Sequence, residues 1–348
     1  MKHLAILTVR NEGAFLLEWI AHHRAAGFDD FLVFSNDCDD GTDDILDRLS
    51  AMGGLTHVRN SGPYDKGGIQ FTALKKAAKL EQVQTADWIL PLDVDEFVNI
   101  HTGDGTLTAL HDALPDATAI TLTWRLFGNN DQVRYSDAPM TETFTKAAPD
   151  ILYWPWRASM FKTLYANDGT YGKPGVHRPR SPDHDMLEHA RWYDSHGRVL
   201  DDQFKTRRIF SNYGRPNFGL AQLNHYPLGS MESFVLKADR GRAVHSDDML
   251  DLDYWVERNF CTTQDDSIRR YDAARNAHLE EMRADSQLAA LHDKAVHWRK
   301  SRFDTLMQSE PFRALFGRLL MSQPTRPVAA KAARLMIQYA NMARKAAQ

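Results

Sequence analysis

The chain has 348 residues, 43% of them hydrophobic, which is enough for one large α/β domain with a smaller appendage. Its formal net charge of −4 gives no overall basic field and argues against nucleic acid as a partner. Its two cysteines, Cys38 and Cys261, lie far apart without metal-binding spacing, and no signal segment precedes the first strand. We therefore expect a cytoplasmic protein.

Residues 1–100 alternate between strand and helix patterns. The predicted order is strand 4–9, helix 15–27, strand 30–36, helix 42–53, strand 55–59, helix 68–86 and strand 88–92. In the helix over 68–86, Phe71 and Leu74 are expected on the buried side. This βαβαβαβ order predicts an α/β, Rossmann-like, mostly parallel sheet with helices on both faces, whose ligands bind beyond the carboxyl ends of the strands.

Polar residues follow each of the first three strands and are expected to converge on one rim of the sheet. The candidates for contacting a nucleotide or phosphate there are Arg10, Asn11, Glu12, Asn36, Asp37 and Lys66. Arg10 suits either a phosphate or a structural ion pair with Glu12 or Asp37. Asp40, just before Gly41, is better explained as a helix cap.

The segment 88–97 is an apolar strand that ends in three carboxylates, Asp93, Asp95 and Glu96. Side chains alternate along an extended chain, so Asp93 and Asp95 are expected on the same face. Two oxygen donors at that spacing can hold a divalent cation and, through it, a phosphate. The simpler alternative is a solvated strand end, because so short a motif arises readily by chance.

Three blocks of the sequence together carry a family resemblance: 8–46 (TVRNEGAFLLEWI…), 87–97 (DWILPLDVDEF) and 223–241 (LNHYPLGSMESFVLKADRG). They resemble the glycosyltransferase family 2 superfamily, in a branch related to family 92. The resemblance implies a GT-A fold, a nucleotide-diphosphate sugar donor, and Mn²⁺ or Mg²⁺ bound through Asp93 and Asp95. Ser35-Asn36 replaces the aspartate that typically faces the nucleobase, so the base is left open.

The third block suggests further ligands. His225 ends a short apolar segment, and a neutral imidazole there suits a third metal ligand, as the resemblance also implies. Otherwise His225 is a packed, hydrogen-bonded histidine. Lys237 and Arg240 lie on the following predicted helix, where they can meet the diphosphate or simply form a solvated basic face.

The catalytic base is taken from the resemblance. Asp265 matches the family's (E)D-x-S-I position, with Asp266 as the second candidate. In a single, inverting displacement, such a carboxylate deprotonates the acceptor hydroxyl. The structural alternative is an aspartate that caps the following helix.

The middle of the chain contains the candidate acceptor surface. A core strand is predicted over 117–124, and Arg125 follows it in a segment that resembles the part of the family that contacts donor sugar and acceptor. Residues 146–196 are rich in aromatics but interrupted by proline and glycine, which predicts loops and short strands. Trp124 and His177 are the substrate candidates, although most of these rings are expected to be core.

The expected domain organisation is a catalytic domain over 1–265, divided into a nucleotide-binding half (1–100) and an acceptor half (101–265). A helical extension follows over 266–348. Its tail has an apolar stripe, with basic residues nearby, at Val328, Ala332, Leu335, Tyr339 and Met342. Such a tail can lie on anionic lipid at the inner face of the membrane, or pack against the catalytic domain or a partner protein.

The leading hypothesis is a cation-dependent glycosyltransferase acting on a carbohydrate or glycoconjugate acceptor. A non-catalytic sugar- or nucleotide-binding protein with a degenerate site is one alternative. A cation-dependent nucleotidyl or phosphoryl transferase is the other. The sequence has neither a G-x-x-x-x-G-K-[ST] loop nor a G-x-G-x-x-G turn after the first strand, which disfavours ATPases and dinucleotide enzymes.

Overall fold

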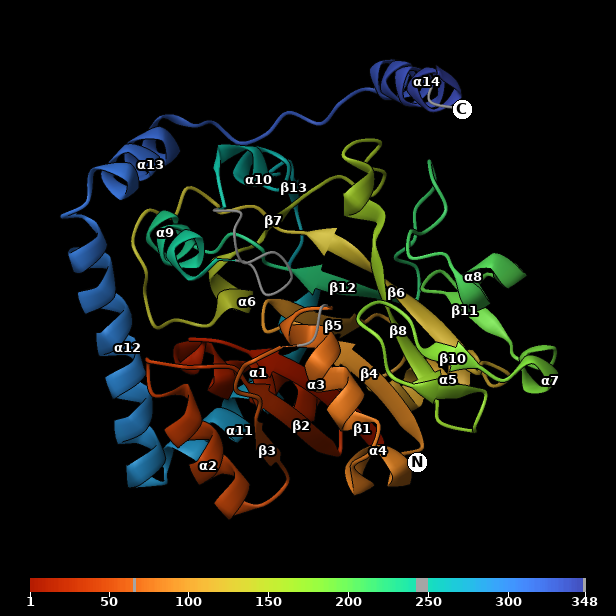
Figure 1. Ribbon diagram of the computed structural model, residues 1–348, viewed down its shortest axis with the longest axis horizontal. Helices are drawn as coiled ribbons and strands as arrows, with labels where there is room; N and C mark the ends of the chain where they lie inside the picture. Colours follow the sequence, from red (N-terminus) through yellow and green to blue (C-terminus); the bar gives the residue numbers. More distant parts are fainter. Residues whose placement is uncertain (65–66, 242–249, 347–348) are drawn as a thin grey trace.

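Strands and helices alternate through the first ninety residues of the computed structural model, which describes residues 1–64, 67–241 and 250–346 (Figure 1). The predicted βαβαβαβ order is confirmed. The elements are β1 (His3–Val9), α1 (Gly13–Ala25), β2 (Asp30–Ser35), α2 (Thr42–Met52), β3 (Thr56–Arg59), α3 (Ile69–Ala77), α4 (Glu81–Thr85) and β4 (Trp88–Leu92).

The helix predicted over 68–86 is interrupted in the structure. Residues 78–80 form a tight turn, in which the Leu80 N–H donates to the Ala77 carbonyl over 3.0 Å. The buried face of α3 consists of Thr72, Ala73, Leu74 and Ala77. Phe71 is 37% exposed, so its predicted place on the buried side is wrong. The buried stripe of α3 therefore runs through Ala73, Leu74 and Ala77, and it includes Leu74 but not Phe71 of the predicted stripe.

The central sheet has the strand order β3-β2-β1-β4-β8-β6-β12-β5, with β11 beside β6. Among the described residues, five of the eight pairings in this sheet are parallel, and β3, β2, β1 and β4 form a continuous parallel half. The carboxyl ends of these four strands therefore meet at one edge. The remaining strands of the sheet are β5 (Glu96–Ile100), β6 (Ala119–Leu126), β8 (Phe161–Ala166), β11 (Trp192–Asp194) and β12 (Ala221–His225).

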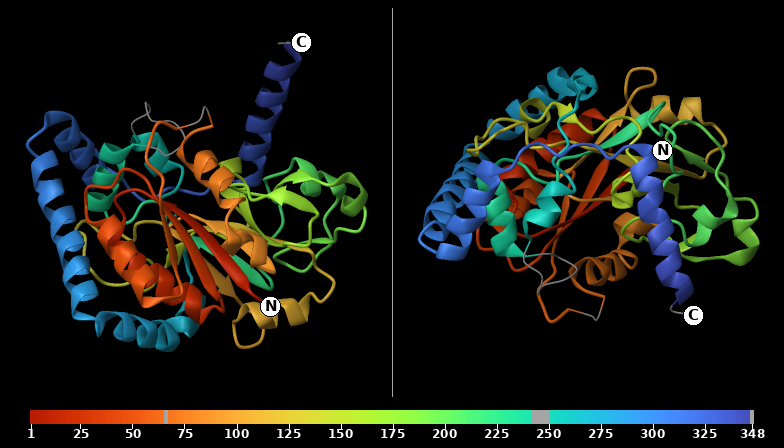
Figure 2. Two further views of the ribbon diagram at one scale, coloured as in Figure 1. Left: turned by 60° about the horizontal axis from the view of Figure 1, so that its bottom comes forward. Right: turned by 90° about the horizontal axis from the view of Figure 1, so that it is seen from above.

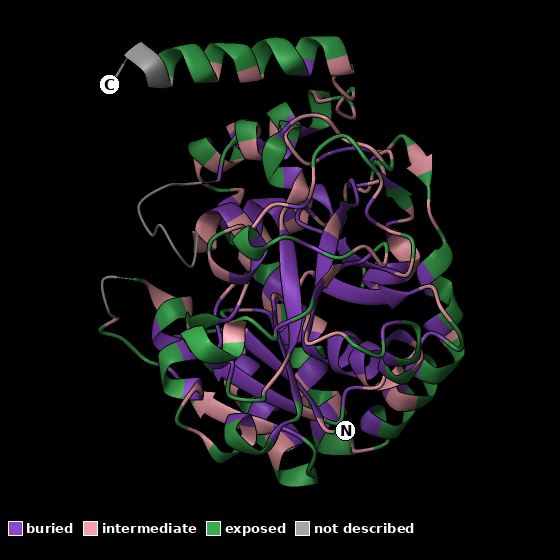
Figure 3. Ribbon diagram, turned by 90° about the vertical axis from the view of Figure 1, so that its right-hand side faces the viewer, coloured by how far each residue is buried: buried purple, intermediate pink, exposed green. Residues whose placement is uncertain are grey.

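Helices cover both faces of the sheet, as predicted. Ala5 and Leu7 of β1 belong to the same core as Leu16 of α1. The alternate residues Leu4 and Ile6 pack with the core that includes α3 on the other face. This two-sided burial explains why the strands are apolar at successive positions. Figure 3 shows the buried sheet surrounded by partly exposed helices.

Short elements occupy most of the middle of the chain, in agreement with the prediction for 146–196. They are α5 (Leu107–Ala113), α6 (Met140–Thr143), β7 (Lys146–Ala147), η1 (Trp156–Ser159), β9 (Tyr171–Lys173), β10 (Arg180–Pro182), α7 (His184–Leu187), α8 (Asp202–Thr206) and β13 (Thr263–Gln264). The frequent turns between them leave little regular backbone in this part.

The C-terminal part is helical, and α11 and α12 pack against α1. α12 therefore lies along the N-terminal half of the molecule, as Figures 1 and 2 show. The predicted division at residue 265 stays a prediction. The last helical elements are α9 (Met231–Arg240), α10 (Leu252–Val256), η2 (Ser267–Tyr271), α11 (Asp272–Arg283), α12 (Ser286–Leu306), α13 (Glu310–Met321) and α14 (Ala330–Ala346).

Helix α14 stands apart from the body of the molecule (Figure 2). Its predicted apolar stripe is exposed at Leu335, Tyr339 and Met342. These side chains therefore do not pack against the rest of the described chain. No helix among the described residues is both long and apolar enough to cross a bilayer. Contact of this tail with lipid or a partner, and the cytoplasmic location, stay predictions.

Candidate functional site

Hydrogen bonds join the ends of the parallel strands into one rim. The Asn36 amide donates to the Val9 carbonyl at the end of β1 over 2.7 Å. Its Oδ1 accepts from the Asn60 amide after β3 over 2.6 Å. Asn36 is buried, so its first role is to hold three strand ends together. The predicted convergence of polar residues at this edge is present.

A cavity of about 270 Å³ opens at this rim. It extends from the ends of β1, β2 and β4 to β12 and α9. Its side chains include basic, acidic and aromatic groups. Among the described residues that line it are Arg10, Glu12, Asn36, Gln70, Asp93, Asp95, Trp124, His225, Lys237, Arg240 and Tyr254.

The acidic segment after β4 is a turn, not the extended strand that the sequence predicted. β4 ends at Leu92 and β5 begins at Glu96, so Asp93, Val94 and Asp95 form the bend between two strands that are not neighbours in the sheet. The alternation argument, which requires extended backbone, is therefore wrong here. Asp93 and Asp95 are held by different cations from different elements.

Asp95 is bound to Lys237 of α9. The Lys237 ammonium group donates to Asp95 Oδ2 over 2.7 Å and to the Pro227 carbonyl over 2.8 Å. His225 Nε2 lies 3.6 Å from Asp95 Oδ1. Burial opposes ionisation of Asp95, but the charge of Lys237 outweighs it and lowers the pKa of this carboxyl well below its usual range.

His225 is buried and uncharged at neutral pH. Burial lowers its pKa to about 4, although Asp95 opposes that shift. Its Nδ1 has no hydrogen-bond partner in the described chain. The ring of Trp124 lies 4.3 Å away, centroid to centroid. Aromatic packing therefore fixes the imidazole beside the cavity.

Asp93 faces a second buried cation, Lys162 of β8. The Lys162 ammonium group donates to Asp93 Oδ2 over 2.9 Å and lies 3.5 Å from Glu96 Oε2. Burial opposes the charge of Lys162, but Asp93 and Glu96 outweigh it and raise the pKa of the lysine. The Gln70 amide donates to Asp93 Oδ1 over 2.7 Å. Both oxygens of Asp93 thus have protein partners.

Basic groups border the cavity near α1. Arg240 forms an ion pair with Glu12, and its Nη1 donates to the Arg10 carbonyl over 2.8 Å. Arg10 itself is exposed, and the predicted ion pairs with Glu12 and Asp37 do not form. Asp37 instead accepts a hydrogen bond from Tyr64. Among the described residues, Arg10 therefore has no ion-pair partner at the rim.

The predicted metal ligands Asp93, Asp95 and His225 do not converge on one point. Asp95 is engaged by Lys237, and Asp93 by Lys162 and Gln70. Within the described ranges, no group of three His, Cys, Asp or Glu side chains is placed to hold a metal ion. The arrangement provides ammonium groups where the sequence predicted a divalent cation.

The other predicted residues of the rim have structural partners. Asn11 Oδ1 accepts from the Asp39 N–H over 2.8 Å. Asp40 accepts from the N–H groups of Gly13 and Thr42, each over 2.9 Å, so it holds the start of two helices, as the capping explanation proposed. Lys66 lies outside the described residues.

The substrate candidates are only partly brought together. Trp124 lines the cavity and donates its indole N–H to Glu96 Oε1 over 2.6 Å. His177 lies next to Trp124, with ring centroids 5.7 Å apart. Arg125 is buried, pairs with Asp150 and lines a separate groove.

Asp265 and Asp266 are absent from the described residues that line the cavity. Asp265 accepts from the Gln222 amide over 2.9 Å and from the Ser267 hydroxyl over 2.6 Å. It also accepts from the Ser267 N–H over 3.1 Å, which holds the start of η2. Asp266 is exposed. Their catalytic role stays a prediction.

Sequence reasoning missed Lys162, Glu96 and Gln70 as members of this site. One signal was present, because a lysine between apolar residues of a buried strand needs a partner for its charge. Glu96 directly follows the acidic pair, but its burial depends on β12 and Trp124. Gln70 carried no signal of its own.

No protein-family model matches the chain. Over 97 residues it is 28% identical to a glycosyltransferase family 92 protein of Ricinus communis, which covers 27% of this chain and 16% of that protein. A family 92 protein of Oryza sativa subsp. japonica is 28% identical over 102 residues, covering 28% and 16%. The chain thus spans well under two thirds of these relatives. A structure of S. aureus TarS 1-349 in complex with UDP shares 14% identity, with a TM-score of 0.33 over 89% of this chain and 92% of that one.

Proposed function

We propose that this protein is a glycosyltransferase that moves a sugar from a nucleoside-diphosphate donor to an acceptor hydroxyl. The observation that carries the proposal is the cavity at the carboxyl ends of β1, β2 and β4, where α/β folds bind ligands. Similarity to the family 92 proteins supports the same reaction class.

The diphosphate is proposed to bind at the basic side of this cavity. Arg10 has no ion pair in the described chain, and Lys237 and Arg240 face the cavity from α9. Guanidinium and ammonium groups form charge-assisted hydrogen bonds with phosphate oxygens. Lys237 is already fixed by Asp95, so it needs little reorganisation when charge builds on the departing diphosphate.

The sugar is proposed to lie toward Trp124. This ring borders the cavity next to His225, and it lies on β6, which β4 and β8 separate from β1 in the sheet. An aromatic face beside a polar cavity suits the apolar face of a sugar ring. No step is assigned to Asp265, because it is held by Gln222 and Ser267 outside this lining.

No step is assigned to a divalent cation either, because its predicted ligands are engaged by lysines. We propose that Arg10, Lys237 and Arg240 neutralise the diphosphate directly. The test is the melting temperature with UDP or GDP, in EDTA and in Mn²⁺. We expect the nucleotide to raise it in EDTA. A rise that requires Mn²⁺ would show that the metal displaces the lysines and would restore the predicted cation dependence.

The reaction class is tested by product analysis with a panel of nucleotide sugars. Slow donor hydrolysis that releases sugar and free nucleoside diphosphate supports glycosyl transfer. Release of a nucleoside monophosphate or a transferred phosphate supports the nucleotidyl or phosphoryl transferase instead. Binding without turnover for every donor and acceptor tried would support the non-catalytic alternative.

A further inference from the structure

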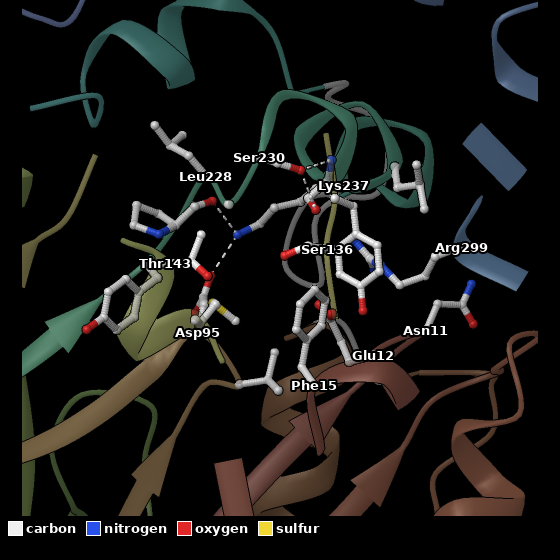
Figure 4. A pocket seen from close by; sticks show the side chains of 18 of the residues that line it. Asn11, Glu12, Phe15, Asp95, Ser136, Thr143, Leu228, Ser230, Lys237 and Arg299 are labelled. Atoms are coloured by element: carbon white, nitrogen blue, oxygen red, sulfur yellow. Dashed lines mark hydrogen bonds and ion pairs between the residues drawn. The ribbon is translucent and has the colours of Figure 1, made fainter. Parts of the chain in front are cut away.

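A second cavity, of about 70 Å³, adjoins the first (Figure 4). It lies between the start of α1, the loop before α6, and helices α9 and α12. The two cavities share Glu12, Asp95, Lys237 and Arg240. At roughly 10–15 Å³ for each water, the second cavity has room for about five waters, the size of a small polar group rather than a sugar ring.

Arg299 of α12 points into this second cavity, toward the side chains of α1 and α9 (Figure 4). It is 5% exposed. Its guanidinium carbon lies 4.4 Å from the ring centroid of Phe15 and 4.9 Å from that of Tyr135. Two aromatic rings therefore hold the guanidinium group within the cavity wall.

Among the described residues, Arg299 has no carboxylate partner. Its Nε is buried without a hydrogen bond in the described chain. Of the other described cations that line this cavity, Lys237 pairs with Asp95 and Arg240 with Glu12, whereas the exposed Arg134 has no ion pair within the described ranges. Arg302, one turn further along α12, pairs with Asp239 over 2.9 Å.

A buried arginine without an anion is costly, because a guanidinium group stays charged in proteins. Burial lowers the pKa of Arg299, while Glu12 favours its charged form. Arg275 shows the usual solution for a fully buried arginine, with both Asp272 and Glu142 as partners. Beside Arg299, the space where such a carboxylate would lie belongs to the second cavity.

We propose that the second cavity binds an oxyanion, a phosphate or carboxylate group carried by the acceptor substrate, through Arg299. This rests on the proposed function, and it gives the acceptor a chemical class. Guanidinium groups bind such anions through paired hydrogen bonds, and the rings of Phe15 and Tyr135 hold this guanidinium group in place. Because Glu12 and Asp95 border both cavities, an acceptor anchored there would lie next to the donor.

The experiment measures the melting temperature of the full chain with inorganic phosphate or acetate, with saturating UDP present to fill the donor cavity. The variant is Arg299→Met, and Lys300→Met is the matched control, because Lys300 is exposed on the same helix. We expect about 10 mM phosphate or acetate to raise the melting temperature of the wild type and of Lys300→Met by about 2 °C. The rise should be absent in Arg299→Met. A larger effect of phosphate identifies a phosphorylated acceptor, and a larger effect of acetate a carboxylated one.

The anion-free proteins give a second readout. Because Arg299→Met removes an uncompensated charge, we expect it to melt no lower than the wild type. A melting temperature well below that of Lys300→Met, with no anion effect in the wild type, would make Arg299 a packing residue and overturn the inference. Failure of UDP to bind any of the three proteins would instead count against the donor site, and the anion titration without UDP would still test Arg299.

Discussion

Two carboxylates, Asp95 after β4 and Asp265 before η2, each lie close to a cation of another element. Asp95 is bound by Lys237 over 2.7 Å. Asp265 accepts from Gln222 over 2.9 Å and lies 3.7 Å from Arg125 Nε. For both, burial favours the neutral acid, but the partners outweigh it and lower the pKa. Charge state alone does not distinguish them.

Their surroundings do distinguish them. Asp95 borders both cavities, and its partner Lys237 borders both as well. Asp265 holds the Ser267 N–H at the start of η2, and its partner Arg125 is tied to Asp150. A cation that borders a cavity can exchange its carboxylate partner for an anionic group of a substrate. A carboxylate that fixes the start of a helix already uses each of its oxygens for structural contacts.

The largest effect is expected at Lys162, the buried cation on the other side of the acidic turn. Lys162→Met leaves Asp93 and Glu96 without their cation, and removing one partner of a buried ion pair costs about 3–5 kcal/mol. Urea unfolding measures this loss. The exposed Lys146→Met is the control, expected within about 0.5 kcal/mol of the wild type. Equal stability of the two variants would contradict the role of Lys162.

The next largest effect is expected from Asp95→Asn. The side chain keeps its shape but no longer fixes the ammonium group of Lys237, so the preorganised charge at the diphosphate position is lost. We expect turnover to fall by about 10²–10³-fold, the usual loss for one electrostatic contact in an active site. Steady-state kinetics measures it, with a donor that the nucleotide-sugar panel shows to be turned over. Turnover close to the wild-type value would remove Asp95 from the site.

A smaller effect is expected from lowering the pH. Whereas no histidine pairs with Asp265 in the described chain, His225 lies beside Asp95 at the cavity. Its folded pKa of about 4 lies below the unfolded value of 6.5, so the unfolded chain binds more protons between them. Stability is therefore lost as pH falls from 6.5 toward 4, by about 2 kcal/mol at pH 5 from this group. Urea unfolding at pH 7 and pH 5 should show a smaller pH difference in His225→Gln. An unchanged difference would mean that folding does not lower the pKa of His225.

Most of the fold was predictable from sequence because its signals are local. β1, β2 and α2 follow from short apolar runs and helical spacing, and their observed bounds differ from the predicted ones by one residue at most. The break after Ala77 was not predictable in this way, because no glycine or proline marks it. The turn at Asp93 was missed for a related reason: its shape depends on β5 reversing beside β12.

The site was predictable in its carboxylates and basic residues but not in their pairing. Lys162 reaches Asp93 across 69 positions of sequence, and Lys237 reaches Asp95 across 142. Such contacts follow from the order of strands in the sheet, which a local pattern does not contain. Arg299 shows the same limit, because its importance lies in a missing partner, and only the packed structure reveals that.

The smallest effect is expected from Asp265→Asn. The amide oxygen can still accept from the Ser267 N–H, and Arg125 keeps Asp150, so only the charge of one structural carboxylate is lost. We expect a loss of about 1 kcal/mol in stability, typical of one weakened hydrogen-bonded contact, and turnover within about threefold of the wild type. Kinetics and UDP binding should be measured together on this variant. If turnover fell by about 10²–10⁴-fold while UDP still bound, the carboxylate would be acting as the general base. The chain would then have to bring it to the acceptor through a change in the contacts that now hold η2.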